Sequence, residues 1–580
     1  MKINIFKYIF IMVILGLVGF AMYNLYNDKK NKENDAVAQN IEKKEETKIP
    51  DIRVGIVGFD TINPILSNNK NVQDLSKIIF DSLLTINEEH KIQNNIVKEY
   101  SLIGEKDFLI KLTEGIKWHN GEELTASDVK FTIDIIKDPN INSIYKESLK
   151  DVIGVEVIDK YTIRINLSRR VPFFEYNLIF PIMSGKYYEG EDFVNTSKNR
   201  NPVGTGMFNV SSADNGDIVL KKNQTWWNEE IKNPYIETIH IKMYGNMGEA
   251  YNAFKTNNID FVTTNNINWK EHVGTIGYNV KEYSGREYDF LMFNLNDSIL
   301  SRKEVRQAIA LGIDKNKINA NVYNNQYIIS NSLLDYGNWL YDQNIKTNLY
   351  NVELARQTLV DAGWEYKNNS WQKIENYKTI RLRITLTVDT ARNVVAQNIK
   401  EDLEKIGIEV IVKQLNDAQY YKNLTEKNFE IILTGKILSL SPDLTGFLGE
   451  GNLANYNNQE VVNILNEING INNEVILKEK YKRLLEIAND ELPYVYLYYN
   501  KSVLAYSYYL SGNVNPNWYN IFYNINAWSR QKWLKKAYKS MNFICWKIQN
   551  KIFLKKYWQN KFSIYNTNIQ TNIWKEKINE

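Results

Sequence analysis

The residue types that most often perform catalysis are few in this sequence and stand far apart. Its four histidines are His90, His119, His240 and His272, and no HExxH or other paired-ligand spacing joins them, which argues against a zinc hydrolase. No G-x-S-x-G motif and no complete phosphate-binding loop occurs. The single cysteine, Cys545, has no histidine near it in the sequence and does not fit a thiol nucleophile. We therefore expect a protein that is not an enzyme, with no cofactor and no metal ligands.

The body of the chain is mildly acidic, which its overall charge conceals. The 580 residues have a net charge of +3, and the shares of hydrophobic (43%) and charged (24%) residues are ordinary for a globular protein. Residues 529–580 hold 12 Lys/Arg against 2 Asp/Glu, so the residues before them carry −7. An acidic body argues against nucleic acid as a partner. The length allows two or three lobes, each with its own core.

The N-terminal segment indicates where in the cell we expect the protein to be. Two lysines precede a charge-free run over residues 8–27, and 20 helical residues span about 30 Å, one hydrocarbon thickness. Phe20 stands where a bacterial lipobox would carry its lipidated cysteine, so no lipid can be attached there. Residues 28–50, with six lysines and six acids, are typical of a solvated linker. We expect residues 1–27 to be an uncleaved anchor rather than a cleaved signal, with the body on the extracytoplasmic face of the cell membrane.

Short strands and helices alternate from residue 52 onward and predict a mixed α/β body. Apolar residues at period two predict strands over residues 108–112, 161–167 and 380–388. Helical spacing and start or stop signals predict helices over residues 125–136 (with a capping box from Thr125 to Asp128), 301–312, 352–362 and 393–406. Strand 380–388, helix 393–406 and strand 408–412 form a predicted βαβ unit.

Five stretches occur in an order that is more specific than any one stretch alone. They are Asn63–Leu66 with IIFDSLLTIN at 78–87, FLIKLTEGIKWHNGEELTASDVKFTIDII at 108–136, NPVGTGMF at 201–208, KEVRQAIALGIDKNKI at 303–318 and DAGW at 361–364. Together they resemble the bacterial extracellular solute-binding proteins of family 5, the oligopeptide-, dipeptide- and nickel-binding substrate-binding proteins of ABC transporters. The resemblance covers residues 51–528.

Within these stretches, each prominent residue also has a structural interpretation. We expect Gly204 and Gly206 to supply positive φ in a tight turn. We expect Trp118 to be a packed anchor, Arg306 a structural ion-pair partner, and His119 a turn histidine rather than a nickel ligand.

The resemblance implies an α/β fold of the type II periplasmic-binding-protein kind, with two lobes of mixed sheets and an inserted third domain. The implied solute-binding domain, 51–528, divides into lobe I (51–78, 197–290, 500–528), the inserted domain (79–196) and lobe II (291–499). Such proteins close like a hinge around a ligand. The chain would cross between the lobes near 286–292 and 497–503.

The sequence departs from the peptide-binding members at the segment that holds a peptide's α-amino group. The family has a Trp and, three residues later, an Asp, where this chain has Lys436 and Ser439; Asp443 lies nearby. A buried ammonium without a carboxylate costs several kcal/mol, of the order of the 2–5 kcal/mol lost when such a pair is truncated. Either Asp443 takes the part of that Asp, or the ligand is not a peptide with a free N-terminus. Both alternatives stay open.

The remaining candidate ligand contacts are tyrosines placed by the same resemblance. DPNINSIY at 138–145 is similar to a loop whose last Tyr lines the peptide cleft, which indicates Tyr145. PYVYLYYN at 493–500 matches the strand that leaves the second lobe and indicates Tyr498 and Tyr499. For each of them a core or surface tyrosine is the alternative. Aromatic rings suit such a site because they offer adaptable apolar walls.

The resulting hypothesis is a membrane-tethered solute-binding protein that captures peptides or a related small solute and delivers it to an ABC importer by hinge closure. Its partners would be the solute, the ABC permease subunits and the membrane, through residues 8–27. The alternative is a peptide sensor or receptor that uses the fold without transport. Residues 529–580 form an expected basic amphipathic tail, which is either a helix on an anionic membrane surface or an unordered appendage.

Overall fold

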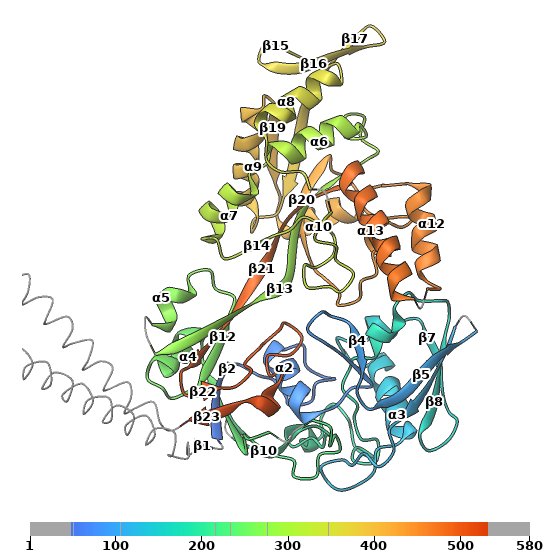
Figure 1. Ribbon diagram of the computed structural model, residues 1–580, viewed down its shortest axis with the longest axis vertical. Helices are drawn as coiled ribbons and strands as arrows, with labels where there is room; N and C mark the ends of the chain where they lie inside the picture. Colours follow the sequence, from blue (N-terminus) through green and yellow to red (C-terminus); the bar gives the residue numbers. More distant parts are fainter. Residues whose placement is uncertain are drawn as a thin grey trace, which may run out of the picture. The chain divides into compact units, whose positions relative to one another are not determined.

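The structure is a computed structural model that describes residues 48–49, 51–104, 106–214, 216–231, 234–274, 277–345, 347–471 and 473–531 (Figure 1). Outside the main body, β1 (Lys48–Ile49) pairs antiparallel with β23 (Ser529–Gln531). No helix of the described residues has both the length and the hydropathy to cross a membrane. The predicted anchor at 8–27, most of the linker and nearly all of the basic tail lie outside the described residues.

One large mixed sheet forms the framework of residues 51–529, as the alternation of strands and helices predicted. Eleven strands of the described residues make it up, with β14 (Ile328–Ile329) paired to β21 off the main path. The path runs β19 (Glu409–Gln414), β18 (Arg383–Val388), β20 (Ile431–Ile437), β13 (Tyr278–Phe293), β21 (Tyr494–Ser507), β12 (Phe261–Thr264), β2 (Asp51–Val57), β11 (Thr238–Tyr244), β10 (Asp217–Lys222), β9 (Phe208–Asp214). The short β22 (Leu510–Ser511) follows β21 in the chain.

The two longest strands, β13 and β21, pair antiparallel and join the two halves of this sheet (Figure 1). Their register shifts between Ser284 and Tyr288 and again between Asp289 and Phe290, so part of β13 has no partner residue in β21. Gly285 lies in this stretch because a Cβ there would stand 1.8 Å from Oδ1 of Asn500. The shifts fall where the chain was expected to cross between lobes. Register shifts of this kind bend a strand and increase its twist.

Residues 84–196 form smaller sheets of their own. The four-stranded one runs β5 (Val97–Ile103), β6 (Asp107–Leu112), β8 (Thr162–Leu167), β7 (Val152–Val157), and β3 (Leu84–Ile86) pairs with β4 (Ile92–Asn94). The predicted strands at 108–112 and 161–167 are thus confirmed, and both show alternating burial. Helix α3 (Ala126–Lys137) begins as predicted, because the Asp128 carboxylate accepts from Thr125 N–H at 2.9 Å.

Helices pack on the large sheet and complete its cores. They are α2 (Lys70–Ile79), α4 (Met247–Lys255), α5 (Trp269–Val273), α6 (Lys303–Gly312), α7 (Lys315–Tyr323), α8 (Val352–Asp361), α9 (Asn393–Lys405), α10 (Asp417–Thr425), α11 (Thr445–Leu448), α12 (Gln459–Ile468) and α13 (Glu474–Glu491). Short 3-10 turns are η1 (Glu147–Leu149), η2 (Phe174–Leu178), η3 (Ser197–Arg200) and η4 (Ile525–Ala527). β18, α9 and β19 form the predicted βαβ unit, with parallel strands.

Two boundaries differ from the sequence prediction. The expected strand 380–388 is two strands: β17 (Lys378–Arg381) joins the small sheet β15 (Glu365–Lys367), β16 (Ser370–Glu375), β17, and β18 joins the large sheet. Periodicity cannot reveal this break, because Leu382 between them keeps the alternation. Helix α6 begins at Lys303 rather than at Ser301, whose hydroxyl donates to the Ser298 carbonyl (3.3 Å).

The NPVGTGMF turn needs its glycines for close approach and not for positive φ, so that prediction was wrong. Gly204 and Gly206 are absent from the positive-φ residues of the described chain. A Cβ on Gly204 would stand 1.9 Å from the Ile79 carbonyl oxygen, and a Cβ on Gly206 would stand 2.6 Å from that of Ile78. The turn therefore lies directly against the end of α2.

Trp118, His119 and Arg306 have structural roles, as expected, although Arg306 fills its role without an ion pair. Trp118 is 3% exposed, which confirms the packed anchor. His119 bonds the same turn on both ring nitrogens, to Gly206 O (3.0 Å) and Gly204 N (3.2 Å). Arg306 is buried, yet its guanidinium donates to the backbone carbonyls of Leu300, Ser301, Glu491 and Leu492 rather than to a carboxylate, so the ion-pair prediction was wrong.

Candidate functional site

A buried ion pair lies at the register shift of β13. Arg286, from the shifted stretch, pairs through Nη1 with Asp335, and each side chain is 3% exposed. The same guanidinium donates to the carbonyls of Leu438 (3.2 Å) and Ser439. Leu438 in return donates its N–H to the Arg286 carbonyl (2.9 Å). Arg286 thereby ties the strand crossing to the loop that follows β20.

A small hollow opens beside this ion pair. It holds about 370 Å³ of empty space, open solvent at its mouth included, and its wall contains Arg286, Leu334, Asp335, Lys436, Ser439 and Asp443. The structure thus brings together three of the candidate residues, Lys436, Ser439 and Asp443. Arg286 and Asp335 were missed by the sequence analysis, because no local pattern relates positions 49 residues apart.

Lys436 supplies a second cation to this wall, in addition to Arg286. It lies on β20 opposite Tyr288 of β13, and its ammonium stands 4.5 Å from the centre of the Phe447 ring. Burial lowers the pKa of the Lys436 ammonium, and the negative charge of Asp443 opposes that shift. Within the described residues no carboxylate forms an ion pair with Lys436. An ammonium over an aromatic face is stabilised, and it can still accept an anionic partner.

Ser439 and Asp443 shape the loop between β20 and α11. Ser439 accepts the Ser441 N–H at its hydroxyl oxygen (3.1 Å). Asp443 accepts the N–H (2.8 Å) and the hydroxyl (2.6 Å) of Thr445 at a single oxygen, Oδ1. Its second oxygen has no hydrogen bond within the described part of the chain. Asp443 can therefore hold the start of α11 and still offer one oxygen to a solute.

Tyr145 lies away from this hollow and does not contribute to its wall. Its hydroxyl donates to Oε1 of Gln73 on α2, and its ring packs 6.2 Å from that of Phe180. Burial raises the pKa of the Tyr145 phenol. In the structure, Tyr145 joins the 138–145 loop to α2.

Tyr498 and Tyr499 are fully buried core residues of β21, at 0% and 1% exposure. Tyr498 donates to the Lys315 carbonyl and Tyr499 to the Leu334 carbonyl, each at 3.0 Å. Tyr499 also stacks on Tyr288 at 4.7 Å. Because Leu334 contributes to the wall of the hollow, Tyr499 supports that wall from behind.

The chemistry available at this site is non-covalent recognition. The wall offers an ammonium, a carboxylate oxygen and hydroxyls, with apolar surface from leucines and Phe447. Among the described residues no group of three or more His, Cys, Asp or Glu side chains is arranged to hold a metal ion. Such a wall can bind a polar or charged solute by complementary charges and hydrogen bonds.

Comparison with known proteins matches most of this chain to one protein family. A family model described as "Bacterial extracellular solute-binding proteins, family 5 Middle" matches residues 92–457. The oligopeptide-binding protein AppA of Bacillus subtilis is 23% identical over 511 residues, which cover 84% of this chain and 92% of that protein. The nickel-binding protein NikA of Staphylococcus aureus is 24% identical over 447 residues, 73% of this chain and 84% of that protein.

The fold is also found among solved structures. That of HbpA2 from Haemophilus parasuis covers 83% of this chain and all of its own (100%), with a TM-score of 0.72 and 18% sequence identity. At that level of identity the likeness shows the fold alone, which is the type II, two-lobed kind expected from the sequence.

Proposed function

Because the chain belongs to the bacterial extracellular solute-binding proteins of family 5, we propose that it captures a peptide or a related small solute outside the cytoplasm and delivers it to an ABC importer. Binding of a solute is the shared property of the family. Tethering by residues 8–27, contact with permease subunits and hinge closure belong to the proposal.

The position of the Lys436 hollow supports hinge closure most directly. The hollow lies at the register shift of β13, and Arg286 bonds both the Leu438 and Ser439 carbonyls on its wall. Bending of β13 against β21 would therefore move the 438–439 loop together with the strand. A solute held between Lys436, Asp443 and groups of the facing lobe would favour the closed arrangement, because only that arrangement offers all the contacts at once.

The charges of the wall restrict the solute. Lys436 has no carboxylate of the described residues as an ion-pair partner, whereas Asp443 keeps one oxygen free of hydrogen bonds in the same part of the chain. We infer that the solute presents an anionic group to Lys436, and that any ammonium it carries meets Asp443. A peptide with both termini free satisfies this arrangement.

The experiment is native mass spectrometry of the full-length chain as purified, followed by calorimetry with the ligand found or with a panel of short peptides. We expect a retained solute, and we expect Lys436→Met to weaken its binding at least about tenfold, or about 1.4 kcal/mol. Lys221→Met, an exposed lysine on β10, is the matched control. If no solute is retained and no panel member binds, or if both variants bind alike, the proposal fails.

A further inference from the structure

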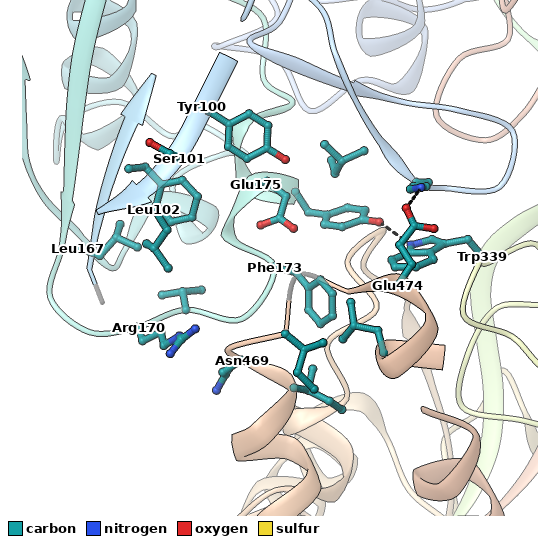
Figure 2. Close-up of a pocket in the computed structure, with 18 residues that line it drawn as sticks. Tyr100, Ser101, Leu102, Leu167, Arg170, Phe173, Glu175, Trp339, Asn469 and Glu474 are labelled. Carbon is teal, nitrogen blue, oxygen red and sulfur yellow. Dashed lines mark hydrogen bonds and ion pairs between the residues drawn. The ribbon is translucent and has the colours of Figure 1, made fainter. Parts of the chain in front are cut away.

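A second hollow lies between strands of the 84–196 region and helices of the 291–499 region (Figure 2). It holds about 1490 Å³ of empty space, open solvent included. One wall comes from β4, β5, β6, β8 and η2, and the other from Trp339, Ile468, Asn469, Ile471, Glu474 and Leu477. It shares no wall residue with the Lys436 hollow, so it is a separate site.

Glu175, on η2, points into this hollow with its carboxylate unpaired (Figure 2). Within the described residues no ion pair or side-chain hydrogen bond ends on it, and only its own backbone N–H approaches it. Burial raises the pKa of the Glu175 carboxyl. Glu175 is partly buried, and a partly buried carboxylate without a partner is a group that the ammonium of a ligand can satisfy.

The surroundings of Glu175 are mostly aromatic. Figure 2 shows its carboxylate between the rings of Tyr100 and Phe173, and Trp339 also lies on the wall. Burial, and then the charge of Glu175, raise the pKa of Tyr100 to about 12. Aromatic faces attract cations, and a nearby carboxylate strengthens that preference.

The cations on the walls of the hollow do not satisfy Glu175. Lys91, which also lines the hollow, is already paired with Glu474. Arg170 lies against Gly470, with its Nη2 3.4 Å from the place where a Cβ of that residue would be. Neither cation is among the groups that shift the pKa of Glu175.

We propose that the Glu175 hollow binds a second ligand, a small amine whose ammonium group meets Glu175 and whose aromatic or apolar body lies among Tyr100, Phe173 and Trp339. The ligand would contact both walls at once. Those walls are already joined by the Lys91–Glu474 pair, by a Trp339 Nε1–H bond to the Tyr176 hydroxyl (3.2 Å) and by edge contact of Phe173 with Tyr481 (6.2 Å). An amine bound there would strengthen the same joint and favour the arrangement of the two regions that contains it.

The test uses the full-length chain and three probes of similar shape: phenethylamine, the neutral 2-phenylethanol and the anionic 3-phenylpropionate. Titration calorimetry should give the tightest binding for phenethylamine and the weakest for 3-phenylpropionate. Glu175→Gln should weaken phenethylamine at least about tenfold. Glu99→Gln, an exposed acid next to Tyr100 on β5, makes the same chemical change outside the hollow and should bind as wild type.

Two further readouts separate a binding role from a structural one. Glu175→Gln should unfold at a higher temperature than the wild type without ligand, because it removes a partly buried carboxylate that has no partner. Because burial raises the pKa of the Glu175 carboxyl above its ordinary value, phenethylamine affinity of the wild type should rise with pH above that ordinary value as Glu175 ionises, and that of Glu175→Gln should not. The other titratable or charged groups at the hollow are Lys91, Tyr100, Arg170, Tyr176 and Glu474.

The proposal is overturned by any of three results. They are equal binding of the amine and the alcohol, unchanged phenethylamine affinity in Glu175→Gln, and no binding of phenethylamine up to about 10 mM, well above the 1 mM constant of a weak complex. Loss of phenethylamine binding in Lys436→Met, with Glu175→Gln unaffected, would assign the amine to the other hollow instead. Failure of the transport proposal would leave all of these results unchanged.

Discussion

Replacing Asp335 by Asn tests the role of the buried ion pair at the strand crossing. The substitution keeps the shape of the side chain and an oxygen that can accept from Arg286, but it removes the charge. Both partners are 3% exposed, so little water reaches them to replace the lost carboxylate. His90, whose Nδ1 stands 3.5 Å from Asp335, offers no negative charge in its place.

The expected loss follows from leaving a guanidinium buried without its counter-charge. Breaking such a pair by removing one partner costs about 3–5 kcal/mol. Arg286 keeps its bonds to the Leu438 and Ser439 carbonyls, and the introduced amide would keep one hydrogen bond, so we expect the lower end, about 3 kcal/mol. At about 1.4 kcal/mol per decade, the folding equilibrium constant falls by roughly two powers of ten.

Equilibrium unfolding in urea, followed by circular dichroism on ligand-free protein, measures this loss as a lower midpoint at unchanged slope. Asp134→Asn is the matched control, because it removes the same charge from an exposed pair with Lys130 on α3 and should cost less than about 1 kcal/mol. A loss below about 1 kcal/mol in Asp335→Asn would refute the reasoning. It would mean that Arg286 is compensated by other groups or by water.

Three further outcomes follow from the described contacts. Gly204→Ala should destabilise by about 1–3 kcal/mol or more, because its Cβ would meet the Ile79 carbonyl at 1.9 Å, whereas Gly446→Ala, with nothing within 4 Å, should unfold at nearly the wild-type midpoint. Arg306→Lys should cost at least about 2 kcal/mol in urea unfolding, since one ammonium cannot satisfy its four backbone carbonyls; a cost equal to that of exposed Arg483→Lys would contradict this. Burial lowers the pKa of His119 from 6.5 to about 4, so the unfolded chain binds the proton first and stability is lost as pH falls from 6.5 towards about 4. Melting temperatures across that range should fall less steeply in His119→Asn, and equal slopes would disprove the assignment.

Local patterns were enough to predict much of the fold. Strands 108–112 and 161–167 alternate in burial as they do in sequence, and the Asp128 cap forms at Thr125. These features depend on neighbours along the chain. The glycines of the 201–208 turn show where such reasoning ends, because the Ile79 carbonyl that excludes a Cβ at Gly204 comes from another element.

The site was harder to predict from the sequence for the same reason. Lys436 lies near the end of β20, Ser439 and Asp443 lie in the loop that follows, and the structure gathers the three on one wall. The partners that define that wall, Arg286 and Asp335, come from a strand crossing and an irregular loop, and no periodicity links them. The buried Tyr498 and Tyr499 could not be distinguished from wall residues, because a strand of continuous apolar and aromatic residues shows no exposed side.

The pairing of β13 with β21 on both sides of the register shift has a consequence for any attempt to divide this protein. Each strand supplies backbone hydrogen bonds to sheet segments on both sides of the register shift, so a cut at that point would leave two fragments with newly exposed sheet edges. Neither fragment should be soluble alone, and co-expressed fragments should recover structure only by rejoining along this ribbon. Because segments 278–293 and 494–507 are paired with each other, we expect residues 51–529 to unfold as one cooperative unit.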